Sequence, residues 1–326
     1  MHLLVTGGAG YVGSVVAEFA LSAGHEVTVI DNLQGGKRAA VPSGCCLVVA
    51  DFGDEQTLDR VLSVARVDAV IHLAAEAAIA TSMTDPAKYF VANVSKGLTL
   101  LQAMWRYGVG RFVFSSTAAT YGEPRTVPIA EDHPLQPINA YGESKLMFER
   151  CLAWFHRAYG LHAICLRYFN AAGATAAHGE DRPEETHLIP LALAAATGQR
   201  DALRVYGADY PTPDGTCVRD YVHVADIARA HLAALERIDE IGFDCFNVGS
   251  ETGYSVLDVI RATEAVTQRR VPHVVSCRRP GDPAVLVATS SKLGRILHWK
   301  PRESSLESIV ETAWAWRTRF PDGYAC

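Results

Sequence analysis

The sequence lacks an excess of positive charge, a Cys-x-x-Cys pair and an apolar run long enough to span a membrane. Its formal net charge of −6 argues against a nucleic acid or an anionic membrane as the main partner. The richest apolar stretch, VDAVIHLAAEAAIA, is interrupted by His72 and Glu76 and falls short of the ~20 residues that a spanning helix needs. The cysteines are scattered, and the adjacent Cys45 and Cys46 suit neither an ordinary bridge nor a metal site. We therefore expect reduced thiols, no bound metal and a cytoplasmic location.

Short β-branched runs alternate with helical patterns through the first half of the 326-residue chain. The runs at 2–6, 26–30, 46–50, 69–73, 111–116 and 162–168 are predicted as strands, and the segments near 12–23, 56–65, 88–107 and 143–158 as helices. Because the strands are almost continuously apolar, we expect them to be parallel and covered on both faces. The repeated units predict an α/β fold with a Rossmann-type, doubly wound parallel sheet.

The alternation of apolar runs and helical patterns stops after residue 170. Residues 171–220 are rich in Gly, Pro and Asp, and the following segments DYVHVADIARAHLAALERI and CFNVGS indicate a return to the sheet. We expect a Rossmann domain over residues 1–170 with an excursion back to it near 220–250. Residues 171–326 are expected to form a smaller, mixed α/β domain.

The segment TGGAGYVGS directly follows the first predicted strand and opens a helix. Gly7, Gly10 and Gly13 allow a tight turn and a close approach of the backbone to a pyrophosphate, which the free amides of the helix N-terminus attract. A glycine-rich turn that only packs the helix on the strand would have the same pattern. The strand before it, the helix after it and an acid at the end of the second strand favour a dinucleotide site.

That acid is Asp31, which can accept both ribose hydroxyls of adenosine and repels a 2′-phosphate. It therefore predicts NAD rather than NADP, although an Asp before Asn32 is also typical of a turn. Asp51 after the third strand fits a contact with adenine. Ala74 and Ala75 after the fourth strand fit a place beside the phosphates, although packing alone could explain these alanines.

The segment NAYGESK places Tyr141 and Lys145 four positions apart, so that on a helix both side chains lie on one face. Oxidising an alcohol requires a base, and ionising a free tyrosine at neutral pH costs about 4 kcal/mol. A lysine ammonium about 5 Å away supplies roughly 3 kcal/mol at an effective dielectric of 20, and the oxidised nicotinamide can supply the rest. The pair is sufficient for a base and its electrostatic partner. The short pattern alone would equally suit an ordinary aromatic and a solvated lysine.

Three hydroxyls end the fifth predicted strand, at Ser115, Ser116 and Thr117. One of them could hydrogen-bond the reacting oxygen and relay its proton. We expect the other two to satisfy turn amides, which is the usual role of Ser and Thr at strand ends.

The segments TGGAGYVGS, DNL, FSSTAATYGE, NAYGESK, RYFNAAGA, YPTPDGTCVRDYVHVAD, NVGS and RRPGDP occur in this order from end to end. Together they resemble the UDP-glucose 4-epimerases (UDP-galactose 4-epimerases) of the extended short-chain dehydrogenase/reductase superfamily. The resemblance implies an isomerase that interconverts UDP-glucose and UDP-galactose. In that reaction hydride is removed from and returned to C4 through a transient 4-keto sugar, and NAD is recycled.

The resemblance also implies roles for individual residues. Thr117, Tyr141 and Lys145 would be catalytic. The expected substrate contacts are Thr117, Asn170, His187, Leu188, Tyr206, Arg219, Arg279 and Asp282. The expected NAD contacts are Gly7, Gly10, Tyr11, Val12, Gly13, Asp31, Asn32, Leu33, Asp51, Phe52, Leu73, Ala74, Ala75, Tyr141, Lys145 and Phe169.

The chemistry of arginine separately supports the expected contacts of Arg219 and Arg279, because an acidic protein needs guanidinium donors to hold a diphosphate. Arg219 could instead form a structural ion pair with Asp220 or another neighbour, and the same holds for Arg279. His187, beside a Leu-Ile-Pro run, could be only a satisfied polar group.

Some features keep other functions open. Ala118 and Ala119 follow Thr117, where sugar-nucleotide dehydratases carry a carboxylate, and this favours epimerisation. Residues 79–82 and Ala77 depart from the family pattern near the cofactor, and Leu286 leaves acceptance of N-acetylhexosamines undecided. The alternatives are a 4-epimerase of a UDP-N-acetylhexosamine, UDP-uronate or UDP-pentose, a dehydratase, and a non-catalytic NAD-binding module.

The helical patterns at 87–105 and 144–159 have apolar residues on more than one face. One face is expected to cover the sheet. We expect the other to pair with a second copy of the chain, giving a homodimer through an intermolecular four-helix bundle.

Overall fold

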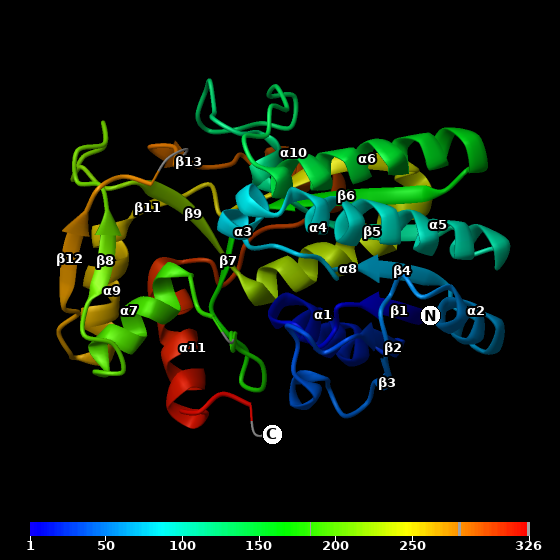
Figure 1. Ribbon diagram of the computed structural model, residues 1–326, viewed down its shortest axis with the longest axis horizontal. Helices are drawn as coiled ribbons and strands as arrows, with labels where there is room; N and C mark the ends of the chain where they lie inside the picture. The colour runs from blue at the N-terminus through cyan, green and yellow to red at the C-terminus, as the bar shows by residue number, and fades with distance from the viewer. Residues whose placement is uncertain (183, 280–281, 325–326) are drawn as a thin grey trace.

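The computed structural model describes residues 1–182, 184–279 and 282–324. Figure 1 shows a large sheet with helices on both faces and, beside it, a smaller group of short strands and helices. Among the described residues, no helix is both long and apolar enough to cross a membrane.

The large sheet has seven strands in the order β10-β6-β5-β4-β1-β2-β3, all parallel. They are β1 (His2–Thr6), β2 (Glu26–Asp31), β3 (Cys46–Val49), β4 (Ala69–His72), β5 (Arg111–Thr117), β6 (His162–Tyr168) and β10 (Phe243–Val248). The predicted α/β class and the six strands from the first half of the chain are confirmed. The strand order reverses between β4 and β1, and ligands of such sheets bind in the crevice at this point.

Helices cover both faces of this sheet. On one face lie α1 (Tyr11–Ser22), α8 (Val224–Ile241) and α10 (Ser291–Leu297), and on the other α2 (Glu55–Val64), α5 (Lys96–Arg106) and α6 (Ala140–Tyr159). Their apolar sides meet the strands in two separate cores, because successive strand residues point to opposite faces.

The predicted helix over 88–107 is interrupted. After α3 (Ile79–Thr84), helix α4 (Pro86–Phe90) passes into a π-turn, η2 (Val91–Ser95), before α5 begins. The buried Asn93 lies in this turn and donates hydrogen bonds to the Glu76 carbonyl and the Ser144 hydroxyl, at 3.0 Å and 2.9 Å. Single π-helical turns inside α-helices are frequent at functional sites.

The smaller group contains β7 (Asn170–Ala172), β9 (Val218–His223), β11 (Gly253–Ser255) and β13 (Val285–Leu286) in one sheet, and β8 (Leu203–Tyr206) with β12 (His273–Ser276) in another. Its helices are α7 (Leu188–Ala196), α9 (Val256–Thr267) and α11 (Leu306–Arg319). Strand β9 leads into α8 and β10, which pack with the large sheet. Our division into domains at residue 170 remains an interpretation of this arrangement.

Candidate active site

The glycine loop between β1 and α1 is packed too tightly for side chains. Gly7 has φ 75°, and a Cβ on it would lie 2.5 Å from the Ala74 nitrogen. A Cβ on Gly13 would lie 2.1 Å from the Gly7 carbonyl oxygen. At Gly10, which precedes α1, an added Cβ would meet only the Gly7 oxygen, at 3.3 Å, within the described part of the chain. The first turn of α1 therefore remains open on the side where a pyrophosphate would approach.

Asp31 ends β2 and is buried. Its carboxylate accepts hydrogen bonds from the backbone amides of Ala9, at 3.0 Å, and Leu33, at 2.8 Å. It thus fixes the glycine loop and the turn after β2, which is the structural role we considered. Because each carboxylate oxygen can accept more than one hydrogen bond, this role leaves capacity for ribose hydroxyls.

The other expected cofactor residues lie around the same edge of the sheet. Leu73 and Ala74 each donate a backbone hydrogen bond of 3.0 Å to the Thr6 carbonyl. Asp51 accepts hydrogen bonds from Lys96, at 2.5 Å, and from the Gly53 amide, at 2.9 Å, so each of its oxygens already has one partner. Phe52 is buried against the ring of His72. The side chain of Phe52 therefore belongs to the core.

The other residues that we expected to contact NAD are held by different kinds of contact. The Tyr11 hydroxyl donates to the Gly173 carbonyl at 2.5 Å, and Val12 packs against the core. Asn32 accepts a hydrogen bond of 3.1 Å from the Gln34 amide. Phe169 is buried in a small apolar cluster.

Helix α6 carries the expected base and its lysine. Asn139 caps the helix by accepting a hydrogen bond of 2.8 Å from the Gly142 amide, which places Tyr141 in the first turn. One turn later the buried Lys145 donates a hydrogen bond of 2.9 Å to the Ser115 carbonyl and lies 4.7 Å from the centre of the Phe114 ring. The predicted helical pairing of Tyr141 and Lys145 is therefore present, and Lys145 holds α6 to the end of β5.

Burial shifts both groups toward their neutral forms. Desolvation raises the pKa of Tyr141, and the neighbouring Thr117 hydroxyl opposes that rise. Desolvation also lowers the pKa of Lys145 to about 7, against the opposing influence of Glu149. Because burial favours the neutral form of both groups, the positive charge of an oxidised nicotinamide would help to ionise Tyr141.

The three hydroxyl side chains at the end of β5 have other hydrogen-bond partners than we predicted. Thr117, the expected catalytic one, accepts a hydrogen bond of 3.2 Å from the Ala119 amide in the short helix η3 (Ala118–Thr120). Ser115 hydrogen-bonds the Tyr168 hydroxyl, and Ser116 donates to Glu149 at 2.5 Å. The expectation that two of the three serve turn amides is wrong, because Ser115 and Ser116 bind side chains of β6 and α6.

A buried ion pair that we did not predict supports this part of the site. Glu149 lies one turn after Lys145 on α6, and the Arg167 guanidinium binds it through two bonds of 2.9 Å and 2.6 Å. Arg167 also donates to the Tyr121 hydroxyl at 3.0 Å, and Tyr121 donates to Asn247 at 2.6 Å. The sequence places Glu149 four residues after Lys145, on the same face of the helix, and this spacing could have indicated a role for Glu149. Its partner on β6, Arg167, could not be identified from the local sequence.

The expected nucleotide-binding residues form two groups. In the first, the Arg219 guanidinium pairs with Asp282 and donates to the Val218 carbonyl at 2.7 Å. Arg279 lies over the Tyr206 ring at 3.8 Å from its centre. Arg219 thus has a structural ion-pair partner, which is Asp282 and not the neighbouring Asp220.

A cleft of about 370 Å³ lies beside this group. Its lining includes Arg279 and Asp282, together with Tyr210 and Arg278, whose guanidinium stacks over the Tyr210 ring at 4.2 Å. Arg278 was missed by sequence reasoning, although it stands next to Arg279. Arg278 also donates to the Asp209 carboxylate at 2.7 Å, and the two guanidiniums beside the cleft suit an anionic ligand.

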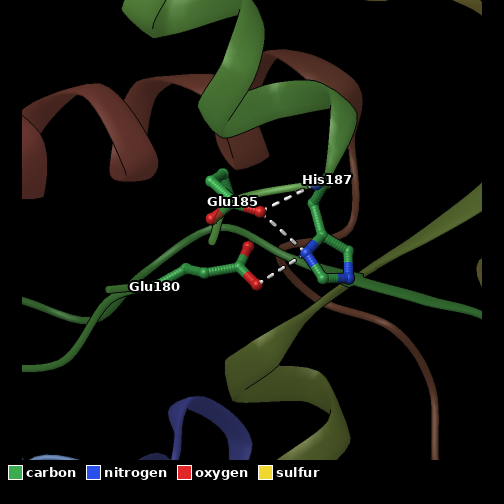
Figure 2. A group of neighbouring side chains, drawn as sticks. All are labelled: Glu180, Glu185 and His187. Carbon is green, nitrogen blue, oxygen red and sulfur yellow. Dashed lines mark hydrogen bonds and ion pairs between the residues drawn. The ribbon is translucent and has the colours of Figure 1, made fainter. Parts of the chain in front are cut away.

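In the second group, Asn170, His187 and Leu188 line a small cavity of about 40 Å³. The Nδ1 atom of His187 lies 3.0 Å from Glu180 and 2.9 Å from Glu185 (Figure 2). Burial alone would lower the pKa of His187, but the hydrogen bonds to these two carboxylates outweigh it and raise the pKa to about 9. His187 is therefore a satisfied polar group that also carries a charge.

Comparison with known proteins agrees with this arrangement. The sequence model of the NAD dependent epimerase/dehydratase family matches residues 3–249. The chain belongs to this family.

Within the family, the chain is similar to UDP-glucose 4-epimerases over its whole length. It is 49% identical to that of Corynebacterium glutamicum, with 99% of this chain and 97% of the relative covered. The crystal structure of the Brucella ovis enzyme in complex with NAD has a TM-score of 0.93 at 42% identity, covering 96% of this chain and 97% of the other. That of the Bifidobacterium longum enzyme in complex with NAD⁺ and UDP has a TM-score of 0.95 at 35% identity, covering 99% and 100%.

These similarities confirm the predicted family resemblance, the fold class and NAD as the cofactor of this family member. The residues present fit NAD, because the glycine loop is open beside Gly10 and Asp31 stands at the end of β2. The roles of individual residues remain predictions.

Replacing Gly13 with alanine is expected to damage the dinucleotide site. The added Cβ would lie 2.1 Å from the Gly7 oxygen, so the loop or α1 must move. We expect the free energy of unfolding to fall by about 1–3 kcal/mol and less NAD to remain bound, as measured by urea denaturation and by NAD released on denaturation. Gly110→Ala is the control, since its Cβ would meet no atom of the described residues within 4 Å. Equal behaviour of the two variants would contradict the prediction.

Proposed function

We propose that the chain interconverts UDP-glucose and UDP-galactose by inverting C4 of the hexose through a transient 4-keto sugar. The observation that carries this proposal is the convergence of Thr117, Tyr141 and Lys145 at the edge of the sheet next to the glycine loop, in a chain similar to UDP-glucose 4-epimerases over its full length. The other UDP-sugars, a dehydratase and a non-catalytic module are the competing functions.

In this proposal the glycine loop would hold the pyrophosphate of NAD, Asp31 the adenosine ribose and Lys145 the nicotinamide ribose. When bound, NAD would supply the redox chemistry, as acceptor and donor of the C4 hydride. Tyr141 takes the proton of the 4-hydroxyl group and later gives it back. Thr117 would hold the sugar oxygen within reach of the neighbouring Tyr141.

Two further features favour epimerisation over elimination. Ala118 and Ala119 follow Thr117 in η3 and offer no carboxylate to remove a second group from the 4-keto sugar. Arg219, Arg279 and their neighbours are proposed to hold the diphosphate while the sugar turns over. A firmly held nucleotide and a loosely held sugar are what inversion at C4 requires.

Tyr141→Phe tests the proposed function directly. Removing the hydroxyl leaves the ring and its packing but no proton acceptor, so kcat for conversion of UDP-galactose to UDP-glucose should fall by about 10²–10⁴-fold. Chromatography of the nucleotide sugars measures this, and a parallel panel of UDP-N-acetylhexosamine, UDP-uronate and UDP-pentose identifies the preferred sugar. Tyr107→Phe, at an exposed tyrosine, serves as the control. A wild-type protein that inverts C4 in none of these sugars would contradict the proposal.

We also propose that the chain acts in the cytoplasm as a homodimer. Support for the dimer comes from Trp105 on α5 and Met147, Trp154 and Tyr159 on α6, all large and exposed. The rings of Trp105 and Tyr159 lie 5.5 Å apart, so these two exposed side chains, one from each helix, lie side by side. Large exposed side chains that lie side by side are typical of a face that pairs with a second copy.

Trp154→Glu is expected to convert the dimer to a monomer, because a charge would be buried in the pairing face. Sedimentation velocity at micromolar concentration distinguishes the two states. Val275→Glu, at an exposed valine on β12, should leave the dimer unchanged. A monomeric wild type would disprove the dimer.

A further inference from the structure

His187 stands between two carboxylates just before α7. Both Glu180 and Glu185 approach the same ring nitrogen, Nδ1, at 3.0 Å and 2.9 Å (Figure 2). The Glu185 oxygen also accepts the backbone amides of Thr186, at 2.8 Å, and His187, at 2.7 Å. Arg182 donates to the Glu180 oxygen at 2.8 Å. The cluster therefore fixes both the backbone and the ring of His187.

The position of the proton follows from this geometry. Because an ionised carboxylate only accepts, we assign the hydrogen to Nδ1 and describe the cluster as an ion pair. Two carboxylates at one imidazole favour its cationic form, in which the second nitrogen, Nε2, also carries a hydrogen. Figure 2 shows this second nitrogen on the side of the ring away from both carboxylates.

His187 lines the same cavity as Asn170 and Tyr221, next to the first turn of α7. Its side chain is 43% exposed, so the ring is accessible to a ligand. The charges that act on it are those of Glu180, Glu185 and Arg182. Together with Arg182 the cluster has no net charge, so a cationic His187 offers a diphosphate a charge-assisted hydrogen bond from Nε2.

We propose that Glu180 and Glu185 are positioning residues, which keep His187 cationic and hold its Nε2–H as a donor to the diphosphate of the nucleotide sugar. The identity of this ligand rests on the proposed function. The two glutamates act only through His187 and do not themselves contact the ligand. Their effect should therefore appear in nucleotide affinity and KM, with little change in kcat.

The test measures the affinity of UDP by calorimetry for the full chain with its bound NAD. Glu180→Gln and Glu185→Gln keep the size of each side chain and remove its charge, and each should weaken UDP binding roughly tenfold, as expected for loss of a charge-assisted hydrogen bond. Glu184→Gln is the matched control, an exposed neighbour in the same segment. In a His187→Gln background, the two glutamate changes should have no further effect.

The pH dependence gives a second readout. In the wild type, UDP affinity should be retained up to the pKa of His187, about 9, and fall above it as the imidazole loses its charge. In Glu185→Gln this loss should begin at lower pH, toward the ordinary histidine pKa of about 6.5. Melting temperatures near that of Glu184→Gln would show that the variants are folded.

Equal UDP affinity in Glu180→Gln, Glu185→Gln and Glu184→Gln would overturn the positioning role. Additive losses in the His187→Gln background would overturn it as well, because the glutamates would then act independently of His187. Both results could occur in a chain that still converts UDP-galactose. Failure of this inference is therefore distinguishable from failure of the proposed function, in which the wild type neither binds UDP nor inverts C4.

Discussion

The position of α6 against the end of β5 is the constraint on which the rest of the site depends. Lys145 donates to the Ser115 carbonyl, and Glu149 accepts from Ser116, so two successive turns of the helix are attached to two successive residues of the strand. Arg167 on β6 completes the attachment by pairing with Glu149. A shift of α6 by one residue would break all three contacts and separate Tyr141 from Thr117.

The parallel sheet supplies the second requirement, a common edge for groups that are distant in sequence. β1, β2, β4 and β5 all end at this edge, so the glycine loop, Asp31, Ala74 and Thr117 face the same crevice. The nucleotide side is formed by the smaller strands, where Arg219 on β9 meets Asp282 before β13. In the proposed function, cofactor and sugar nucleotide would be held by different parts of the chain, with the reacting carbon between them.

Sequence reasoning predicted most of the fold and the chemistry at the sheet edge because both depend on local patterns. The strands were predicted from apolar runs. Tyr141 and Lys145 lie on one helix, where their spacing alone determines that they share a face. The partners of Ser115, Ser116 and Glu149 were not predicted, because these contacts join separate elements. The same applies to Glu180 and Glu185, whose role is visible only once the loop places both beside His187. The π-turn at 91–95 escaped prediction because Asn93 fits a helical pattern as well as the turn.

In the proposed reaction, C4 of the sugar loses its hydrogen and regains the same hydrogen within one site. The direct test uses UDP-glucose carrying deuterium at C4, with the product examined by mass spectrometry and NMR. We expect a galactosyl product that retains the deuterium at C4. A product whose C4 hydrogen comes from solvent, or deuterium that moves to another carbon, would contradict it.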